Sequence, residues 1–276
     1  MRYLPDLLSA RRIGAYGLSE PGAGSDAGGL KTTARRDGDA YVIDGAKTFI
    51  TNAPIADVFV VWAKLPDDNG EDQIRGFILE KGWKGLSAPA IHGKVGLRTS
   101  ITGEIVLDEV FVPEENLMPD VRGLKGPFTC LNSARYGIAW GVMGAARDSF
   151  DAALAYSLER TPFGRPLAGF QLTQQKLADM AVEINKGTLL ALHLGRLKDA
   201  GKLQPHQISL AKLSNTREAI EIARSARTVL GGNGILLEYS PIRHANNLES
   251  VRTYEGTDEV HTLVLGQHIT GISAFR

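Results

Sequence analysis

The feature that most limits the fold is a change in the period of the apolar residues near Asn132. Before it, short apolar runs alternate with glycine-rich and polar turns, which is typical of β-strands. After it, apolar residues recur at helical spacing over long segments. We therefore predict an α+β chain: an antiparallel β-sandwich or barrel domain over residues 1–120, followed by an antiparallel four-helix bundle over residues 121–276.

The predicted elements follow from these runs. The expected strands lie at residues 13–18, 31–35, 40–44, 58–63, 75–80, 104–108 and 110–112, and the expected helices at 133–160, 167–200, 206–230 and 240–272. The polar residues 36–39 predict a hairpin turn, and the short connections between helices imply antiparallel neighbours. In the second helix, His193 lies in an apolar run, which favours a core histidine over a ligand.

The last predicted helix is interrupted at Gly256. Ser240 is expected to cap the part before the interruption and Thr257 the part after it. Glu255 therefore lies in a turn between an aromatic residue and a glycine. Two interpretations stay open at this point. The carboxylate is either satisfied by N–H groups at a helix end, or it is a general base whose pKa is raised by apolar surroundings.

Composition excludes several classes of protein. Lys and Arg together number 31, as do Asp and Glu, so the chain lacks the basic excess of a nucleic-acid-binding protein. The single cysteine, Cys130, excludes an internal disulfide framework and suits a reducing compartment. There is no apolar run of membrane-spanning length and no signal-peptide core at the start. The six histidines show no paired metal-ligand spacing, so we predict no metal.

Two stretches of the first half suggest a binding site. Residues 16–26 form a glycine-lined loop whose N–H groups and serine hydroxyls suit a phosphate or a polar ring edge. Phe49, with Thr51 and Asn52 beyond it, suits a planar cofactor. A plain surface turn and an ordinary strand end remain the alternatives. We reject a dinucleotide-binding reading of residues 22–27, because Pro21 and the glycines that follow break the required strand and helix.

Two loops of the second half are also unusual. Residues 160–171 carry two arginines, whose charge and fork geometry suit a pyrophosphate. Residues 230–235 form a glycine cluster at a helix end, for which a left-handed C-cap turn is the alternative. Together the loops suggest a large anionic cofactor and an anionic substrate.

These motifs together resemble the acyl-CoA dehydrogenase family of flavoenzymes over nearly the whole chain. The motifs lie at residues 18–26, 47–52, 160–164, 174–179, 230–234 and 254–257. Within that family, the chain is most similar to the glutaryl-CoA type at residues 74–82, 132–141, 242–249 and 269–275. Family members begin with a helical domain, which we expect this chain to lack because it starts just before the β domain.

The resemblance implies FAD-dependent oxidation and decarboxylation of glutaryl-CoA to crotonyl-CoA, a step of lysine and tryptophan degradation. Glu255 would remove the α-proton of the thioester while the flavin N5 takes a β-hydride. The alternatives are dehydrogenation of another short-chain acyl-CoA without decarboxylation, or an inactive flavin-binding remnant. The family implies an electron-transferring flavoprotein as electron acceptor and a homo-oligomer, usually a tetramer. The location would be the cytoplasm of a bacterium or the mitochondrial matrix of a eukaryote.

The resemblance also assigns residues, some of them to FAD of a neighbouring subunit. Those assigned to the cofactor are Tyr16, Leu18, Ser19, Gly24, Ser25, Phe49, Ile50, Thr51, Arg160, Phe163, Gln171, Thr228, Leu230, Gly231, Gly232 and Thr257. Those assigned to the substrate are Ser25, Phe128, Leu131, Asn132, Arg135, Tyr254 and Gly256.

Overall fold

A computed structural model describes residues 2–67 and 69–275. Contacts between Cα atoms divide the chain into two compact units, which we call the β unit and the helical unit. The β unit comprises Met1–Lys94 and Arg98–Cys130, and the helical unit comprises Val95–Leu97 and Leu131–Arg276. The expected α+β order, strands first and helices second, is confirmed.

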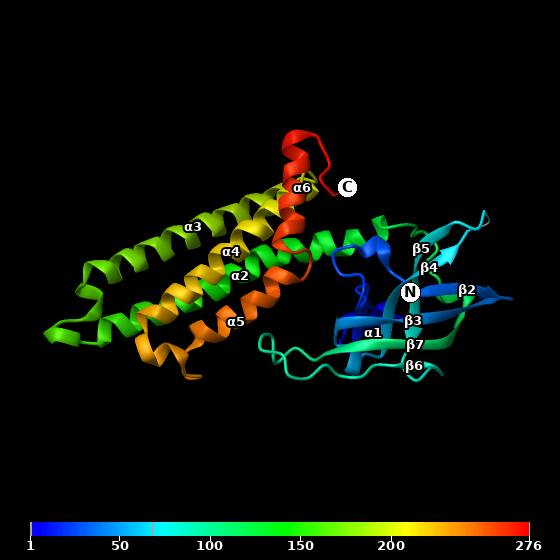
Figure 1. Ribbon diagram of the computed structural model, residues 1–276, viewed down its shortest axis with the longest axis horizontal. Helices are drawn as coiled ribbons and strands as arrows, with labels where there is room; N and C mark the ends of the chain where they lie inside the picture. The colour runs from blue at the N-terminus through cyan, green and yellow to red at the C-terminus, as the bar shows by residue number, and fades with distance from the viewer. Residues whose placement is uncertain (1, 68, 276) are drawn as a thin grey trace. The chain divides into compact units, whose positions relative to one another are not determined.

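The β unit is built on one mixed sheet (Figure 1). Its strands are β1 (Gly14–Gly17), β2 (Thr33–Asp37), β3 (Ala40–Thr51), β4 (Val58–Pro66), β5 (Asp72–Glu80), β6 (Leu86–Ser87) and β7 (Thr102–Pro113). β3 pairs antiparallel with β2 and β7, and β4 pairs antiparallel with β5. Two pairs differ from the antiparallel expectation, because β1 and β2 both run parallel to β4. The two strands expected between residues 104 and 112 are one strand, β7.

The hairpin between β2 and β3 forms where the polar turn predicts it. Asp37 pairs with Ala40, and Gly38 takes the positive φ of 62° that a tight turn needs. Further along β3, Gly45 is required by a close approach, because a Cβ there would lie 2.4 Å from Thr32 Oγ1. Beyond it, the register with β7 shifts between Lys47 and Ile50. This shift spans Phe49, which is exposed between the buried residues Thr48 and Ile50.

A buried ion pair lies beside the apolar core of the β unit. Lys47 Nζ is 2.7 Å from Glu20 Oε1, and the lysine side chain is completely buried. The same carboxylate accepts hydrogen bonds from the backbone N–H groups of Lys31 and Thr32 and from the Thr32 hydroxyl. Burial by itself would raise the pKa of Glu20. The hydrogen bonds from Lys47 and Thr32 outweigh burial, so the pKa lies below its ordinary value.

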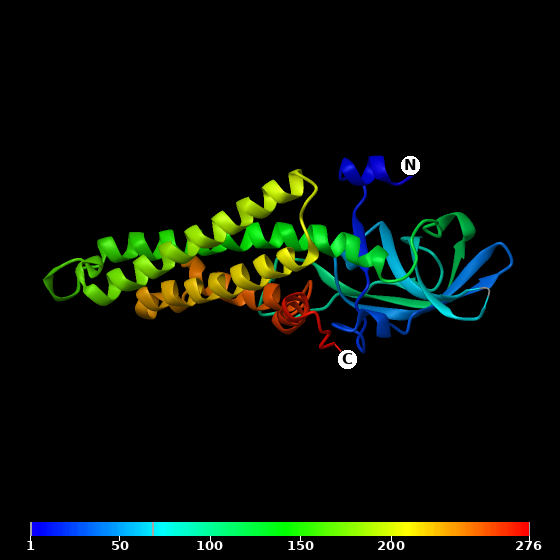
Figure 2. The same cartoon turned by 90° about the horizontal axis from the view of Figure 1, so that it is seen from above.

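The helical unit contains the four expected helical segments, the fourth of which is divided in two (Figures 1 and 2). The helices are α2 (Lys125–Glu159), α3 (Gln171–Asp199), α4 (Pro205–Val229), α5 (Ser240–Thr253) and α6 (Asp258–Thr270). Both views show α2 to α5 side by side from residue 131 onward. The short helical elements of the chain are α1 (Leu4–Leu8), η1 (Ala27–Gly29), η2 (Ala53–Ile55), η3 (Glu114–Asn116), η4 (Pro162–Gly164), η5 (Leu167–Gly169) and η6 (Gly231–Ile235).

Three local expectations differ from the structure. α2 begins earlier than residue 133, at Lys125. The N-cap of α5 is Tyr239 and not Ser240, which is already the first helical residue. His193 is exposed, as are Leu189 and Leu192 of the same apolar run, so it is not a core histidine. An apolar run on a helix therefore does not by itself place a residue in the core, because apolar side chains also cover much of a protein surface.

The apolar core of the helical unit contains side chains of α2, α3, α4 and α5. It joins Val142 and Ala146 of α2, Ile184 of α3, Ile220 of α4 and Leu248 of α5. The segment Val95–Leu97 joins this unit because the Leu97 N–H donates to Asn247 Oδ1 at 2.7 Å. Over the described ranges, none of the helices combines the length and the hydropathy needed to cross a bilayer.

Replacing Lys47 by methionine should destabilise the β unit by about 3–5 kcal/mol, because the Glu20 carboxylate would be left buried without its cation. Urea unfolding followed by tryptophan fluorescence measures this change, since Trp62 and Trp83 lie in the β unit. The exposed Lys81→Met is the control and should change stability by less than about 0.5 kcal/mol. Equal unfolding midpoints for the Lys47 and Lys81 variants would contradict a stabilising role of the Lys47–Glu20 ion pair.

Candidate active site

The residues between α5 and α6 form a sharp turn, Tyr254–Thr257, which we call the Glu255 turn. Glu255 has a φ of 55° and Gly256 a φ of 92°, so two successive residues lie in the left-handed region. The turn ends where Thr257 caps α6 by accepting a hydrogen bond from the Val260 N–H at 3.3 Å, as the sequence predicts. A left-handed glutamate is uncommon and costs free energy, so the surroundings must hold it in place.

Any side chain at position 256 would be strained in this turn. A Cβ at Gly256 would lie 2.9 Å from His261 Nε2 and 3.1 Å from His261 Cε1. The His261 ring is completely buried, and its Nδ1 lies 3.0 Å from Ser209 Oγ on α4. The ring therefore has little freedom to move away. Its burial and the nearby positive charges lower the His261 pKa to about 4, so the ring is neutral at physiological pH.

The Glu255 carboxylate is mostly buried. Its side chain is 23% exposed, and its Oε2 has no hydrogen-bond partner among the described residues. The closest cationic atom is Arg135 Nε, 4.0 Å from that oxygen. The same Nε donates a 2.7 Å hydrogen bond to the Glu255 carbonyl oxygen, and Arg135 Nη1 donates to Asn132 Oδ1 at 3.2 Å. Arg135 on α2 therefore holds the backbone of the turn and leaves the carboxylate available.

Burial sets the acidity of this carboxylate. Loss of water raises the pKa of Glu255 above its ordinary value, and the charges of Arg135 and Lys212 oppose that rise in part. A carboxylate with a raised pKa is a stronger base than one in water. It can accept a proton from a weak carbon acid, provided the developing negative charge of the acid is also stabilised.

Lys212 on α4 holds the turn from another direction. Its side chain is completely buried, and its Nζ donates to the carbonyl oxygens of Gly256 at 2.7 Å and Arg252 at 3.2 Å. These two carbonyls flank Glu255 in sequence. Burial lowers the pKa of Lys212 to about 8, so the ammonium form still predominates at neutral pH.

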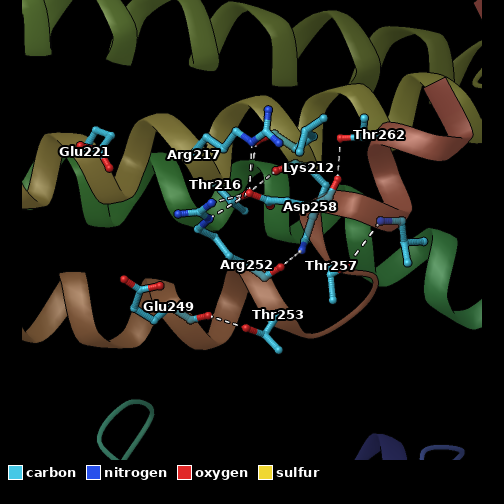
Figure 3. Close-up of polar contacts among 12 residues, drawn as sticks. Lys212, Thr216, Arg217, Glu221, Glu249, Arg252, Thr253, Thr257, Asp258 and Thr262 are labelled. Carbon is cyan, nitrogen blue, oxygen red and sulfur yellow. Dashed lines mark hydrogen bonds and ion pairs between the residues drawn. The ribbon is translucent and has the colours of Figure 1, made fainter. Parts of the chain in front are cut away.

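A third contact fixes the start of α6 (Figure 3). Asp258 Oδ2 accepts hydrogen bonds from Arg252 Nη2 at 2.6 Å, Arg252 Nε at 3.0 Å and Arg217 Nε at 3.1 Å. Burial alone would raise the pKa of Asp258, but these two arginines outweigh it and lower that pKa. The carboxylate thereby joins α4 and α5 to the first residue of α6, where the Glu255 turn ends.

Several residues predicted for the cofactor lie together in the β unit. The Thr48 N–H donates to the Ser19 carbonyl oxygen at 3.0 Å, which places the end of β1 beside the irregular part of β3. Phe49 is 69% exposed with a φ of 56°. Gly24 and Ser25 are exposed in the loop after β1, where the loop closes on itself through hydrogen bonds between Glu20 and Ala23. Of the other residues predicted here, Tyr16 donates to the Pro127 carbonyl oxygen, Leu18 and Ile50 are buried, and Thr51 is exposed.

A second group of predicted cofactor residues lines a pocket of about 360 Å³ in the helical unit. The predicted residues among its lining are Arg160, Leu230, Gly231 and Gly232. A Cβ at Gly231 or Gly232 would meet no atom within 4 Å, so these glycines leave open space. Gly231 has a φ of 59°, so the left-handed backbone conformation also favours a glycine at this position. Both a helix-ending turn and a binding loop therefore describe this segment.

The remaining predicted residues are not in either group. Phe163 is 96% exposed, Gln171 begins α3 on the surface, and Thr228 donates its hydroxyl to the Arg224 carbonyl oxygen. Phe128 is partly exposed on α2, and Leu131 is half-buried. Tyr254 stands in the Glu255 turn, and burial raises the pKa of its hydroxyl.

Sequence reasoning missed Lys212, His261, Asp258 and the arginines that pair with Asp258. For Lys212 a signal was present, because it falls on the helical stripe that includes Ile208, Asn215, Ala219 and Ile222. All of those residues are buried, and a lysine on such a stripe needs a partner inside the protein.

Two protein-family models match the chain. The acyl-CoA dehydrogenase middle domain matches residues 15–110, and the acyl-CoA dehydrogenase C-terminal domain matches residues 122–270. A short-chain-specific acyl-CoA dehydrogenase of Clostridium acetobutylicum is 38% identical over 97% of this chain and 71% of its own length.

Two solved structures are also similar. A glutaryl-CoA dehydrogenase of Mycobacterium smegmatis has 56% identity and a TM-score of 0.96, covering 100% of this chain and 70% of that one. A glutaryl-CoA dehydrogenase of the same organism, in complex with FADH2, has 53% identity with the same TM-score and the same coverage.

Gly256→Ala should destabilise the helical unit by about 1–3 kcal/mol, because the new Cβ meets the buried His261 ring at a strained φ. Denaturant unfolding followed by Trp140 fluorescence measures the loss. Gly266→Ala on α6 is the matched control: a Cβ there meets nothing within 4 Å, and alanine favours the helix by up to about 1 kcal/mol. A Gly256 variant as stable as the Gly266 variant would show that the contact with His261 is not limiting.

Proposed function

The chain belongs to the acyl-CoA dehydrogenase family, and we propose that within it the protein oxidises and decarboxylates glutaryl-CoA to crotonyl-CoA. Its general activity is that of a flavoprotein oxidoreductase with FAD as cofactor, as the family match and the FADH2-bound relative indicate. The observation that carries the catalytic proposal is the Glu255 carboxylate, which is mostly buried, has a raised pKa and has no hydrogen-bond partner for Oε2 within the part of the chain that the structure describes.

Sequence identity supports the choice of glutaryl-CoA. The two Mycobacterium smegmatis structures titled glutaryl-CoA dehydrogenase are 56% and 53% identical over the whole chain. The relative named as short-chain specific is 38% identical. The name of this short-chain-specific relative favours the alternative function, in which a short monocarboxylic acyl-CoA is dehydrogenated without loss of CO2.

In the proposed reaction, Glu255 takes the α-proton of the thioester. The proton passes to its carboxylate while the β-carbon gives up a hydride, so the substrate loses two electrons and two hydrogens. Bound FAD supplies the acceptor for that hydride. We propose that the Glu255 backbone N–H donates to the thioester oxygen, because negative charge develops there as the proton leaves. Arg135 keeps this N–H and the carboxylate in one orientation by holding the Glu255 carbonyl.

The residues present fit FAD in two places. In the β unit, the exposed Phe49 ring offers a flat apolar face beside the loop that carries Ser19. In the helical unit, Arg160 and the open glycines Gly231 and Gly232 line a pocket that suits an anionic group. We propose that the helical-unit residues serve the cofactor of a neighbouring subunit in a homo-oligomer, and that an electron-transferring flavoprotein reoxidises the enzyme.

Glu255→Gln should retain bound flavin and lose flavin reduction, because the amide keeps the size of the side chain but cannot accept the α-proton. We expect the rate of anaerobic flavin bleaching by glutaryl-CoA to fall by at least about 100-fold. Stopped-flow absorbance measures this rate. Glu115→Gln, at an exposed glutamate of η3, is the control and should bleach at the wild-type rate. Bleaching at the wild-type rate in the Glu255 variant would refute the assignment of the base.

Glutaryl-CoA turnover should release one CO2 for each crotonyl-CoA formed, because the distal carboxylate leaves after dehydrogenation. Capture of labelled CO2 from glutaryl-CoA, with chromatography of the acyl-CoA products, measures both. Butyryl-CoA is the control substrate: it lacks the distal carboxylate and can give crotonyl-CoA without CO2. Turnover of butyryl-CoA together with no turnover of glutaryl-CoA would replace our proposal by the alternative.

A further inference from the structure

Lys212 is a buried cation without an adjacent anion. Its side chain is completely buried, and the two hydrogen bonds of its Nζ go to backbone carbonyls at 2.7 and 3.2 Å. No carboxylate of the described residues lies within the 4.0 Å of an ion pair with it. Burying an ammonium group costs several kcal/mol. The two carbonyl contacts are neutral, so the compensation for its charge must come from groups slightly farther away.

We propose that Lys212 is a positioning residue for proton abstraction, which binds the backbone on both sides of Glu255 and adds positive charge near its carboxylate. This inference rests on the proposed function only in taking Glu255 as the base. It does not depend on which acyl-CoA is oxidised.

The two carbonyls explain the positioning part of the role. The Arg252 carbonyl lies in the last turn of α5, where carbonyl oxygens lack intrahelical partners and the helix end carries partial negative charge. The Gly256 carbonyl follows Glu255 directly. A single ammonium that donates to both closes the turn from one side, and Arg135 holds the Glu255 carbonyl from another.

The charges around Lys212 explain the electrostatic part. The charged groups that act on it are Asp258 of α6, Arg252 of α5, Arg135 of α2 and Glu255 itself. Asp258 is already bonded to Arg252 and Arg217, so its charge is matched. His261, the remaining titratable neighbour, has a pKa lowered to about 4 and is neutral above that pH.

Asp258 acts on Lys212 most strongly, and Glu255 is the second carboxylate whose charge favours the ammonium form. Arg135, whose Nε lies 4.0 Å from Oε2, has the larger effect on the Glu255 carboxylate, and Lys212 adds to it. Because burial raises the pKa of Glu255 and Lys212 opposes the rise, loss of the Lys212 charge must raise that pKa further. The sign for activity follows. The base works when deprotonated, so the rate rises with pH through the Glu255 pKa, and a higher pKa moves that rise to higher pH.

The test compares Lys212→Met, which removes the charge and the donor, with Lys212→Gln, which removes the charge and retains a donor. Lys202→Met, at an exposed lysine just before α4, is the control. In the flavin-loaded full chain without substrate, pH-difference infrared spectroscopy follows the protonated carboxyl band that Glu255→Gln lacks. We expect the Glu255 titration to move up by about one pH unit in both Lys212 variants and to stay unchanged in the control.

Kinetics supply the second readout. The acid limb of the pH profile for flavin reduction should move up by the same amount in Lys212→Gln, while the rate at high pH stays within a few-fold of wild type. If Lys212 only holds the backbone, Lys212→Gln should fold and the Glu255 carboxyl should titrate at the same pH as in the wild type. That result would overturn the proposal. The infrared titration uses no substrate. Its result therefore stays valid even if the protein oxidises an acyl-CoA other than glutaryl-CoA.

Discussion

A mostly buried carboxylate, whose nearest cation among the described residues is 4.0 Å away, is the constraint on which the rest of the site depends. Desolvation alone would raise the pKa of Glu255 and favour its protonated form, and a close bidentate arginine would lower that pKa and make it a weaker base. The structure lies between these limits. Arg135 Nε stands 4.0 Å from the carboxylate and directs its hydrogen bond to the carbonyl of the same residue. One side chain thus orients the base and leaves its oxygens available.

Holding such a residue requires a rigid frame, because Glu255 and Gly256 both adopt positive φ angles. The frame consists of helix ends. α5 ends at Thr253 and α6 begins at Asp258. Between them, Lys212 of α4 binds the Gly256 carbonyl and Arg135 of α2 binds the Glu255 carbonyl. Lys212 binds the Arg252 carbonyl, which lies in the last turn of α5, while Arg135 binds the Glu255 carbonyl in the turn itself. The strain of the turn and the exposed carbonyls are therefore compensated by the same contacts.

Much of this could be predicted from the sequence. The Thr257 cap, the interruption at Gly256 and the position of Glu255 between two helices follow from local rules, and the structure has them. The parallel pairing of β1 with β4 could not be predicted that way, because it joins strands far apart in the chain and leaves no local pattern. Lys212 was missed for a different reason: its place on an apolar helical stripe indicates burial, but a lysine on a helix is ordinarily assigned to the solvated face, and its carbonyl partners lie far away in sequence. Local sequence patterns therefore predict the residues of turns and caps, but they do not predict contacts between residues far apart in the chain.

The Asp258 contact has a consequence for the response to ionic strength. Its carboxylate is 7% exposed and receives N–H groups from both Arg217 and Arg252, whereas the Arg224–Glu249 pair is about half exposed on both sides. Dissolved ions screen exposed pairs and reach buried ones poorly. Concentrated salt should therefore weaken the exposed Arg224–Glu249 pair between α4 and α5 more than the contacts of Asp258 at the start of α6.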